Sequence, residues 1–193
     1  MGYPLMNIPK EFYSTETNTP LERCIDCERY LLEEGVEYII EKAMRYYKSY
    51  DLDNTIFEYA ICRTCADKMM ASLSRSSLTK INAHFELHSD LPLRAHKNSK
   101  REDEPNIEEL IGRCLLNNTT RGENREYQIC CQCVGDQMVL SHMPYMLGME
   151  AMEEIQELLS PETKRELDGF VGDNFGLPPE WKKAIEDRPV LVI

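Results

Sequence analysis

The pattern of apolar and polar positions predicts a β-hairpin in the N-terminal part of the chain. Within residues 36–47, Val36, Tyr38 and Ile40 recur at every second position, so their side chains share one face of an extended strand. Residues 48–55 are polar, and residues 56–61 form a second short apolar run. Two apolar runs joined by a polar segment are typical of a hairpin, here with a long tip.

The period of the apolar positions changes after residue 65. Across residues 66–88 they recur every three to four residues, which predicts helix: Met69, Met70, Leu73, Ile81 and Phe85. Ser74 lies inside this stretch and can cap a second helical segment, because its hydroxyl accepts a hydrogen bond from a free backbone amide. Residues 89–106 are mostly polar and charged, and we interpret them as a polar linker between two halves.

Two acidic helices are predicted in the C-terminal half, at residues 148–159 and 161–171. The first has an apolar stripe that indicates a core-facing side. The second starts at Ser160-Pro161, because serine can cap a helix and proline suits its first position. Residues 178–193 predict a short helix and then an apolar edge strand, Val190–Ile193, which docks on the chain itself or pairs with another subunit.

The charge of the chain is uneven. It has 22 Lys and Arg against 34 Asp and Glu, a net charge of −12. Residues 1–100 carry 13 basic and 15 acidic side chains (net −2), and residues 101–193 carry 9 and 19 (net −10). Such an excess repels phosphate backbones. No apolar stretch approaches the roughly 18 residues of a membrane span, and no signal peptide is visible, so we expect a cytoplasmic protein.

Eight cysteines carry the strongest chemical signal, and four of them form two Cys-x-x-Cys pairs. In a cytoplasmic protein, paired cysteines favour a metal over a disulfide. Two pairs brought together by a hairpin supply four thiolates, which suit Zn²⁺ and leave no open coordination position. The sequence therefore predicts a structural zinc site made of Cys24, Cys27, Cys62 and Cys65. We hypothesise that Arg23, Arg63 and Lys68 offset its negative charge.

A cysteine pair, a hairpin and a second cysteine pair that opens a helix together resemble a treble-clef zinc finger, over about residues 22–88. A plain zinc ribbon is the alternative. Rubredoxin-like iron sites use the same two pairs but carry glycine after each, where this chain has Glu28 and Ala66, so iron ranks second. Nuclease versions need a histidine beside the second strand, where residues 59–61 offer none.

The second half of the chain echoes the first. Arg23-Cys24 recurs as Arg113-Cys114, and Leu73-Ser74 recurs as Leu159-Ser160. The pattern E-Y-x-I-C-x-x-C occurs at residues 58–65 and again at residues 126–133. These echoes predict an internal duplication, in which the hairpin of the second copy turns near Arg121-Gly122. The expected units are residues 1–88 and 107–193, with residues 89–106 between them.

The second copy offers an incomplete ligand set. Cys114 is matched with Cys24, and Cys130 and Cys133 are matched with Cys62 and Cys65, but Asn117 stands where Cys27 would be. His142, or less easily Cys131, could supply a fourth ligand to a second zinc. The alternative is a degenerate finger whose core replaces the ion. An open three-ligand site is the only route to catalysis that the sequence offers, and we do not expect an enzyme.

Three other groups of residues have weaker interpretations. His84 and His88 stand four apart on a predicted helix, and we expect surface or interface histidines. A small basic cluster, Arg94, Lys97, Lys100 and Arg101, is interpreted as part of the solvated linker rather than a nucleic-acid contact. Cys62-Arg63-Thr64-Cys65 at a helix start also suits thiol redox chemistry, but the second pair favours metal.

These observations predict an α+β protein made of two related zinc-finger-like units, each with a knuckle, a β-hairpin and a helix. The second unit is degenerate, and acidic helices follow it. The expected function is that of a zinc-stabilised binding or regulatory protein that acts through protein–protein contacts. The alternatives are a nucleic-acid-associated zinc-finger protein and, less favoured, a thiol redox protein.

Overall fold

The computed structural model describes residues 3–101, 103 and 105–175. Within them the chain forms six β-strands and six α-helices. The strands are β1 (Leu5–Asn7), β2 (Glu37–Tyr47), β3 (Leu52–Cys62), β4 (Glu126–Val134), β5 (Gln137–Val139) and β6 (Tyr145–Gly148). The α-helices are α1 (Arg63–Ser72), α2 (Arg75–His88), α3 (Leu91–Ser99), α4 (Ile107–Ile111), α5 (Met149–Leu158) and α6 (Pro161–Phe175). Short 3₁₀ helices, η1 (Lys10–Phe12) and η2 (Arg121–Glu123), precede β2 and β4.

All six strands belong to one antiparallel sheet. The order along it is β1-β5-β4-β2-β3, and β6 pairs with β4. Strand β2 is central, because β3 lies along one of its edges and β4 along the other. The β2–β4 pairing runs from Glu37 opposite Val134 to Arg45 opposite Glu126, and Glu41 stands opposite Cys130 at its midpoint. The two halves of the chain therefore share a single sheet.

Several elements predicted from the hydrophobic pattern are confirmed. The hairpin is β2–β3, with a longer second strand than the apolar run at residues 56–61 suggested. The helical stretch divides at Ser74, which caps α2 by accepting a hydrogen bond from the Ser77 amide at 3.2 Å. The two acidic helices are α5 and α6. The predicted C-terminal helix and edge strand, residues 178–193, lie outside the described residues.

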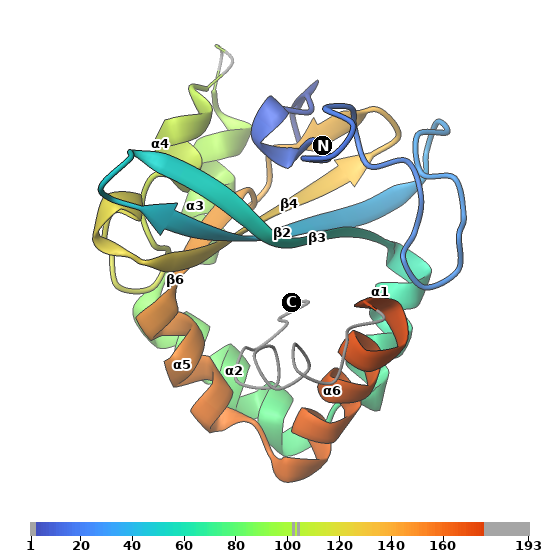
Figure 1. Cartoon of the computed structure of the whole chain (residues 1–193), viewed down its shortest axis with the longest axis vertical. Coiled ribbons are helices and arrows are strands. Elements are labelled where there is room, and N and C mark those ends of the chain that lie inside the picture. The colour runs from blue at the N-terminus through green and yellow to red at the C-terminus, as the bar shows by residue number, and fades with distance from the viewer. Residues whose placement is uncertain (1–2, 102, 104, 176–193) are drawn as a thin grey trace.

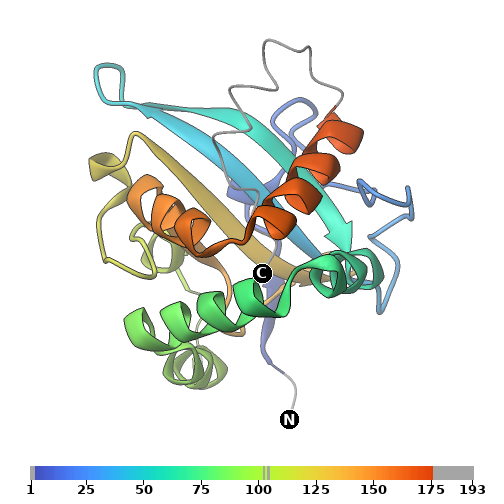
Figure 2. The same cartoon turned by 90° about the horizontal axis from the view of Figure 1, so that it is seen from below.

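Four of the helices lie on the side of the sheet opposite the N-terminal segment (Figure 1). Helices α1, α2, α5 and α6 lie on one side, and η1 and its neighbours lie on the other (Figure 1). The view from below shows α5 and α6 crossing the sheet, with α2 beside them (Figure 2). Side chains alternate between the two sides along each strand. On β3, Tyr59 packs against Phe170 and Phe175 of α6, whereas Glu58 bonds Thr15 near η1.

The middle of the chain differs from the local expectations at two places. The predicted polar linker at residues 89–106 contains a helix, because α3 occupies Leu91–Ser99 and is capped by the Asp90 carboxylate. Arg121-Gly122 is not a hairpin turn, because both residues belong to η2, which leads into β4.

No described helix has the length and apolar character needed to cross a membrane.

Candidate metal centre

The first cysteine pair lies on a tight turn between Arg23 and Tyr30. The Cys24 amide donates to the Arg29 carbonyl at 3.0 Å, and the Glu28 amide donates to the Cys24 carbonyl at 2.9 Å. Glu28 adopts a φ of 58°, a left-handed conformation that reverses the chain just after Cys27. Arg23 braces the turn by donating from Nη1 to the Glu28 carbonyl at 3.1 Å. These bonds hold Cys24 and Cys27 on one side of the turn, which is called the knuckle below and comprises residues 23–30.

The second cysteine pair stands where β3 passes into α1. Cys62 ends β3 and is the N-cap residue of α1, and Cys65 lies in the first turn of that helix. The knuckle is tied to this strand by the Ile25 amide, which donates to the Ala60 carbonyl at 2.8 Å. A hydrogen bond from the Cys62 amide to Cys24 Sγ, at 3.3 Å, joins the two pairs directly. The strand–helix junction thus faces the knuckle.

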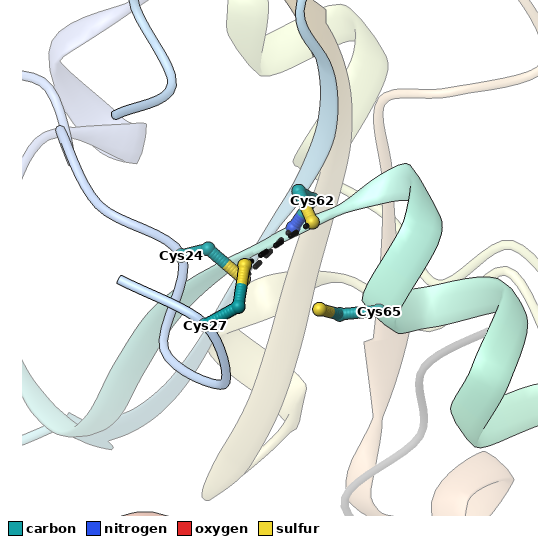
Figure 3. Close-up of side chains that lie close together, drawn as sticks. All are labelled: Cys24, Cys27, Cys62 and Cys65. Atoms are coloured by element: carbon teal, nitrogen blue, oxygen red, sulfur yellow. Dashed lines mark hydrogen bonds between the residues drawn. The ribbon is translucent and has the colours of Figure 1, made fainter. Parts of the chain in front are cut away.

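The four sulfurs point toward one another (Figure 3). All four Sγ atoms of Cys24, Cys27, Cys62 and Cys65 lie within 4.8 Å of one another, so they are close enough to bind one metal ion. Cys27 Sγ and Cys62 Sγ are 3.8 Å apart. A tetrahedral ion with metal–sulfur bonds of about 2.3 Å requires sulfurs about 3.8 Å apart. This separation is far longer than a disulfide bond, and all four thiols are free.

The four thiols differ in burial. Cys24, Cys62 and Cys65 are buried, whereas Cys27 is exposed. Burial raises the pKa of the Cys24 and Cys65 thiols. The pKa of Cys27 is lowered, first by a backbone hydrogen bond from Arg29. The cluster is therefore largely closed to solvent and opens at one sulfur.

Arg23 is one of the three cations proposed to offset the negative charge of the cluster, and its observed role is to brace the knuckle. Its guanidinium donates to the knuckle backbone rather than to a sulfur. Arg63 pairs with Asp67 at 2.8 Å and, more loosely, with Glu37 at 3.9 Å. Both Arg63 pairs are exposed, so the structure gives Arg63 surface ion pairs.

A second turn in the chain repeats the backbone hydrogen bonds of the knuckle. The Cys114 amide donates to the Thr119 carbonyl at 2.8 Å, and the Asn118 amide donates to the Cys114 carbonyl at 3.0 Å. Asn118 has a φ of 59°, and Arg113 Nη1 donates to the Asn118 carbonyl at 3.1 Å. The Leu115 amide then donates to the Met146 carbonyl of β6 at 2.8 Å. Each bond has a counterpart at residues 23–29 and 60.

Comparison with protein-family models, curated proteins and solved structures found no match for this chain. The site must therefore be interpreted from its own geometry.

The predicted match of Cys130 and Cys133 with Cys62 and Cys65 is wrong. Cys130 and Cys133 lie within strand β4, not at a strand–helix junction. Residues three apart on a strand point to opposite faces, so these two sulfurs cannot bind one ion as a knuckle pair does. Cys133 Sγ instead lies 3.7 Å from Cys131 Sγ on its own face. Burial raises the pKa of Cys130 and Cys131 well above the ordinary value.

The structure also does not bring the four ligands of the second predicted site together. Among the described residues, only the Cys24 cluster gathers three or more such ligand atoms within 4.8 Å. Cys114 is buried beside Met146, with which it forms an isolated β-bridge. His142 is largely buried next to Arg94, and burial together with that charge lowers its pKa. Asn117 uses its side-chain oxygen to accept hydrogen bonds from Thr119.

The small basic cluster is not a free cationic surface. The Arg94 guanidinium donates to the carbonyl oxygens of His142, Leu110 and Pro144 at 2.6–2.8 Å, and burial lowers its pKa. Arg101 pairs with Glu109 at 3.3 Å. Arg94 therefore joins α3 to the loop before β6, a structural role that the polar character of residues 89–106 concealed.

One acidic residue near the histidine pair was missed. Glu154 of α5 places a carboxylate oxygen 3.4 Å from His84 Nε2. The rings of His84 and His88 lie 4.4 Å apart, as expected for residues one helical turn apart. No local signal predicts the contribution of Glu154, because it follows the histidines by more than 60 residues and reaches them only through helix packing.

Proposed function

We propose that this protein is a zinc-stabilised binding protein whose four-cysteine site is structural and which acts through protein–protein contacts. The observation that carries the proposal is the convergence of Cys24, Cys27, Cys62 and Cys65, whose sulfurs lie within 4.8 Å of one another. One pair is 3.8 Å apart, the spacing of a tetrahedral sulfur shell. Four thiolates complete the coordination of Zn²⁺ and leave no position for a substrate. A knuckle, a hairpin and a helix that carries the second pair support a finger of the treble-clef type.

The zinc would fix the fold around the centre of the sheet. It would link the knuckle to the junction of β3 and α1, and β3 pairs along nearly the whole of β2. Structural zinc sites in small modules contribute about 10–16 kcal/mol, which exceeds the net stability of many domains. We therefore assign the ion to folding rather than to chemistry. The net charge of −12 favours a basic protein partner over nucleic acid, and the engagement of Arg94 in the interior supports the same choice.

The chain is further proposed to contain two copies of one zinc-finger-like unit, of which the second has lost its metal. The first support is the shared pattern of hydrogen bonds in the turns at residues 23–30 and 113–120. The second is the order of the elements after each turn. A ten-residue helix starts after Cys62 and another starts after Gly148, and both end just before a Leu-Ser pair and a further helix.

Contacts between the two proposed units are also reciprocal. The Ser74 amide donates to Thr163 Oγ1 at 3.0 Å, and the Ser160 amide donates to Ser77 Oγ at 2.8 Å. Strands β2 and β4 pair antiparallel about the midpoint between Glu41 and Cys130. An exchange of equivalent partners of this kind is expected of two similar units related by an approximate twofold axis.

The correspondence explains why the second unit needs no ion. It places Cys114, Asn117, Gly148 and Ala151 where the first unit has Cys24, Cys27, Cys62 and Cys65, so one thiol of four remains. A Cβ atom added to Gly148 would collide with the side chain of Asn124. Asn124 donates to Thr119 Oγ1 at 3.0 Å and to the Thr120 carbonyl at 2.8 Å. Asn124 thus holds the second turn by hydrogen bonds, and its side chain packs against Gly148 at the end of β6, where the first unit has a metal ligand.

The experiment is a matched pair of substitutions, Cys24→Ser and Cys114→Ser, measured by native mass spectrometry and elemental analysis of protein purified without chelator. Both cysteines are buried at the same position of their turns. We expect one zinc per chain in the wild type and in Cys114→Ser, and loss of zinc with a large drop in melting temperature in Cys24→Ser. Equal zinc content in the two variants would contradict the proposal.

The partner contact is tested separately with a set of basic proteins and with a duplex DNA, at the same ionic strength. Binding to a basic protein that depends on zinc loading would support the protein–protein role. Binding to DNA alone would revive the nucleic-acid alternative.

A further inference from the structure

Three side chains of types that bind metals lie near one another where α2 packs on α5, although their ligand atoms do not all lie within 4.8 Å of one another. His84 and His88 come from α2, and their ring centroids lie 4.4 Å apart. Glu154 comes from α5, and its Oε2 atom lies 3.4 Å from His84 Nε2. The two helices pack against each other, and they lie side by side below the sheet (Figure 1).

The position of His84 Nε2 is informative. This atom is buried and has no hydrogen-bond partner among the described residues, although a carboxylate oxygen lies 3.4 Å away. An aligned N–H···O bond would be nearer 2.9 Å. Two ligand atoms on a tetrahedral ion, each bonded at about 2.0–2.1 Å, stand about 3.4 Å apart. His84 Nε2 and Glu154 Oε2 are therefore spaced as two ligands of one metal ion would be.

We propose that His84, His88 and Glu154 form a second, exchangeable site for Zn²⁺. Imidazole nitrogens with one carboxylate suit zinc better than Mg²⁺ or Ca²⁺, which prefer oxygen ligands alone. His88 and Glu154 are exposed, so the His88 ring is free to rotate, and the proposed site requires it to turn toward His84 Nε2. Water fills the fourth coordination position. Unlike the closed cysteine cluster, this site is open to solvent and exchanges its ion with the surrounding medium.

Zinc at this site would act as a clamp. It would join α2, which follows the first cysteine cluster, to α5 of the second half, and so restrain the two sets of helices against each other. A site with solvent-exposed ligands responds to the concentration of free zinc, whereas a buried four-thiolate site stays loaded. The histidine site does not depend on the proposed role of the cysteines, because the two sites share no residue.

The test is calorimetric titration of Zn²⁺ into the full chain after the cysteine site has been loaded to one zinc per chain, checked by elemental analysis. We expect one additional zinc to bind to the wild type. His88→Ala, which changes an exposed side chain, should weaken this second event by roughly tenfold or more. Glu154→Gln should weaken it as well. His96→Ala is the matched control, since His96 is exposed on α3, and it should leave the second event unchanged.

Cobalt provides an independent readout of the ligands. A second Co²⁺ bound by imidazole and carboxylate should add absorption without a new thiolate charge-transfer band. The proposal is overturned if the loaded protein takes up no second zinc at millimolar concentration. It is also overturned if His88→Ala and Glu154→Gln bind the second ion as tightly as His96→Ala does.

Discussion

Lys42 and Glu58 show how single side chains attach the N-terminal segment to the sheet. Lys42 is 4% exposed and pairs with Glu58 at 3.0 Å. It also donates to the Tyr13 carbonyl at 2.6 Å. Glu58 accepts hydrogen bonds from the amide and hydroxyl of Thr15, at 2.7 and 2.8 Å. The charge of Lys42 is tolerated in the interior because each of these partners faces it.

This arrangement predicts a pH dependence of stability. Burial raises the pKa of Glu58, but hydrogen bonds from Thr15 and Lys42 outweigh it, so the folded-state pKa is lowered. An unfolded glutamate titrates near pH 4.3, so the folded protein releases this proton more readily. The contribution of Glu58 is therefore complete above about pH 4.3 and is lost as the pH falls through the lower folded value.

Glu58→Gln should remove that part of the acid sensitivity and should destabilise the protein at neutral pH by about 1–3 kcal/mol, because Lys42 loses a charged partner. Urea unfolding at pH 7 and at a series of pH values below 4.3 measures both effects. Glu11→Gln is the control, since Glu11 is exposed and forms no ion pair within the described part of the chain. A variant that loses as much stability on acidification as the wild type does would contradict this assignment.

At the scale of elements, hydrogen bonds join the N-terminal ends of α2 and α6. Ser74 Oγ and Ser160 Oγ are 2.9 Å apart, and each serine amide donates to a hydroxyl of the other helix. Ser77 and Thr163, which supply these hydroxyls, are both fully buried. The caps of α2 and α6 therefore form one hydrogen-bond network rather than two separate caps.

The network predicts that cap substitutions are not additive. Ser74→Ala and Ser160→Ala should each cost about 1–2 kcal/mol, in the upper range for N-cap serines, because each leaves a buried partner unsatisfied. The double variant should cost less than the sum by about 0.5 kcal/mol or more. A double-mutant cycle by urea unfolding measures this coupling. Ser99→Ala, at the exposed end of α3, should change stability little. Strictly additive costs would show that the two caps are independent.

At the scale of the whole molecule, one sheet carries both proposed units. Strand β2 pairs with β3 of the first unit and with β4 of the second. Unfolding that begins at the cysteine cluster would therefore disrupt the sheet in both halves. The cysteines that remain in the second half are absorbed into its core, where Cys130, Cys131 and Cys133 are buried within β4. If the proposed duplication is correct, packing would hold the second unit where four thiolates would hold the first.

If the two units are copies, a metal site can be rebuilt in the second. Asn117→Cys, Gly148→Cys and Ala151→Cys would complete a four-thiolate set with Cys114, and Asn124→Gly would remove the side chain that blocks a residue-148 Cβ atom. We expect two zinc ions per chain in this variant, counted by native mass spectrometry. The same variant with Cys114→Ser as well should return to one. A zinc content that stays at one, in a variant that keeps a cooperative unfolding transition, would contradict the proposed correspondence.

The local sequence determined the elements that are specified by residues only a few positions apart. Alternating apolar positions specified the β2–β3 hairpin, and Ser74 and Ser160-Pro161 specified helix starts, because a cap and a hydrophobic period act over a single turn. The two Cys-x-x-Cys pairs likewise predicted the ligand cluster, since a tight turn and a strand–helix junction each present two sulfurs together.

The tertiary structure alone decided which partners the second half of the chain meets. The pattern E-Y-x-I-C-x-x-C suits both a strand that ends at a helix and a strand that continues, because its own residues do not encode the next element of the chain. After Cys65 the chain keeps a helical period, whereas after Cys133 it turns at Gly135, with a φ of 56°. Pairing of β4 with β2, and packing of α5 on α2, then placed Cys130 opposite Glu41 and Glu154 beside His84. Contacts between residues so far apart depend on the closure of the whole sheet, and no short stretch of sequence contains them.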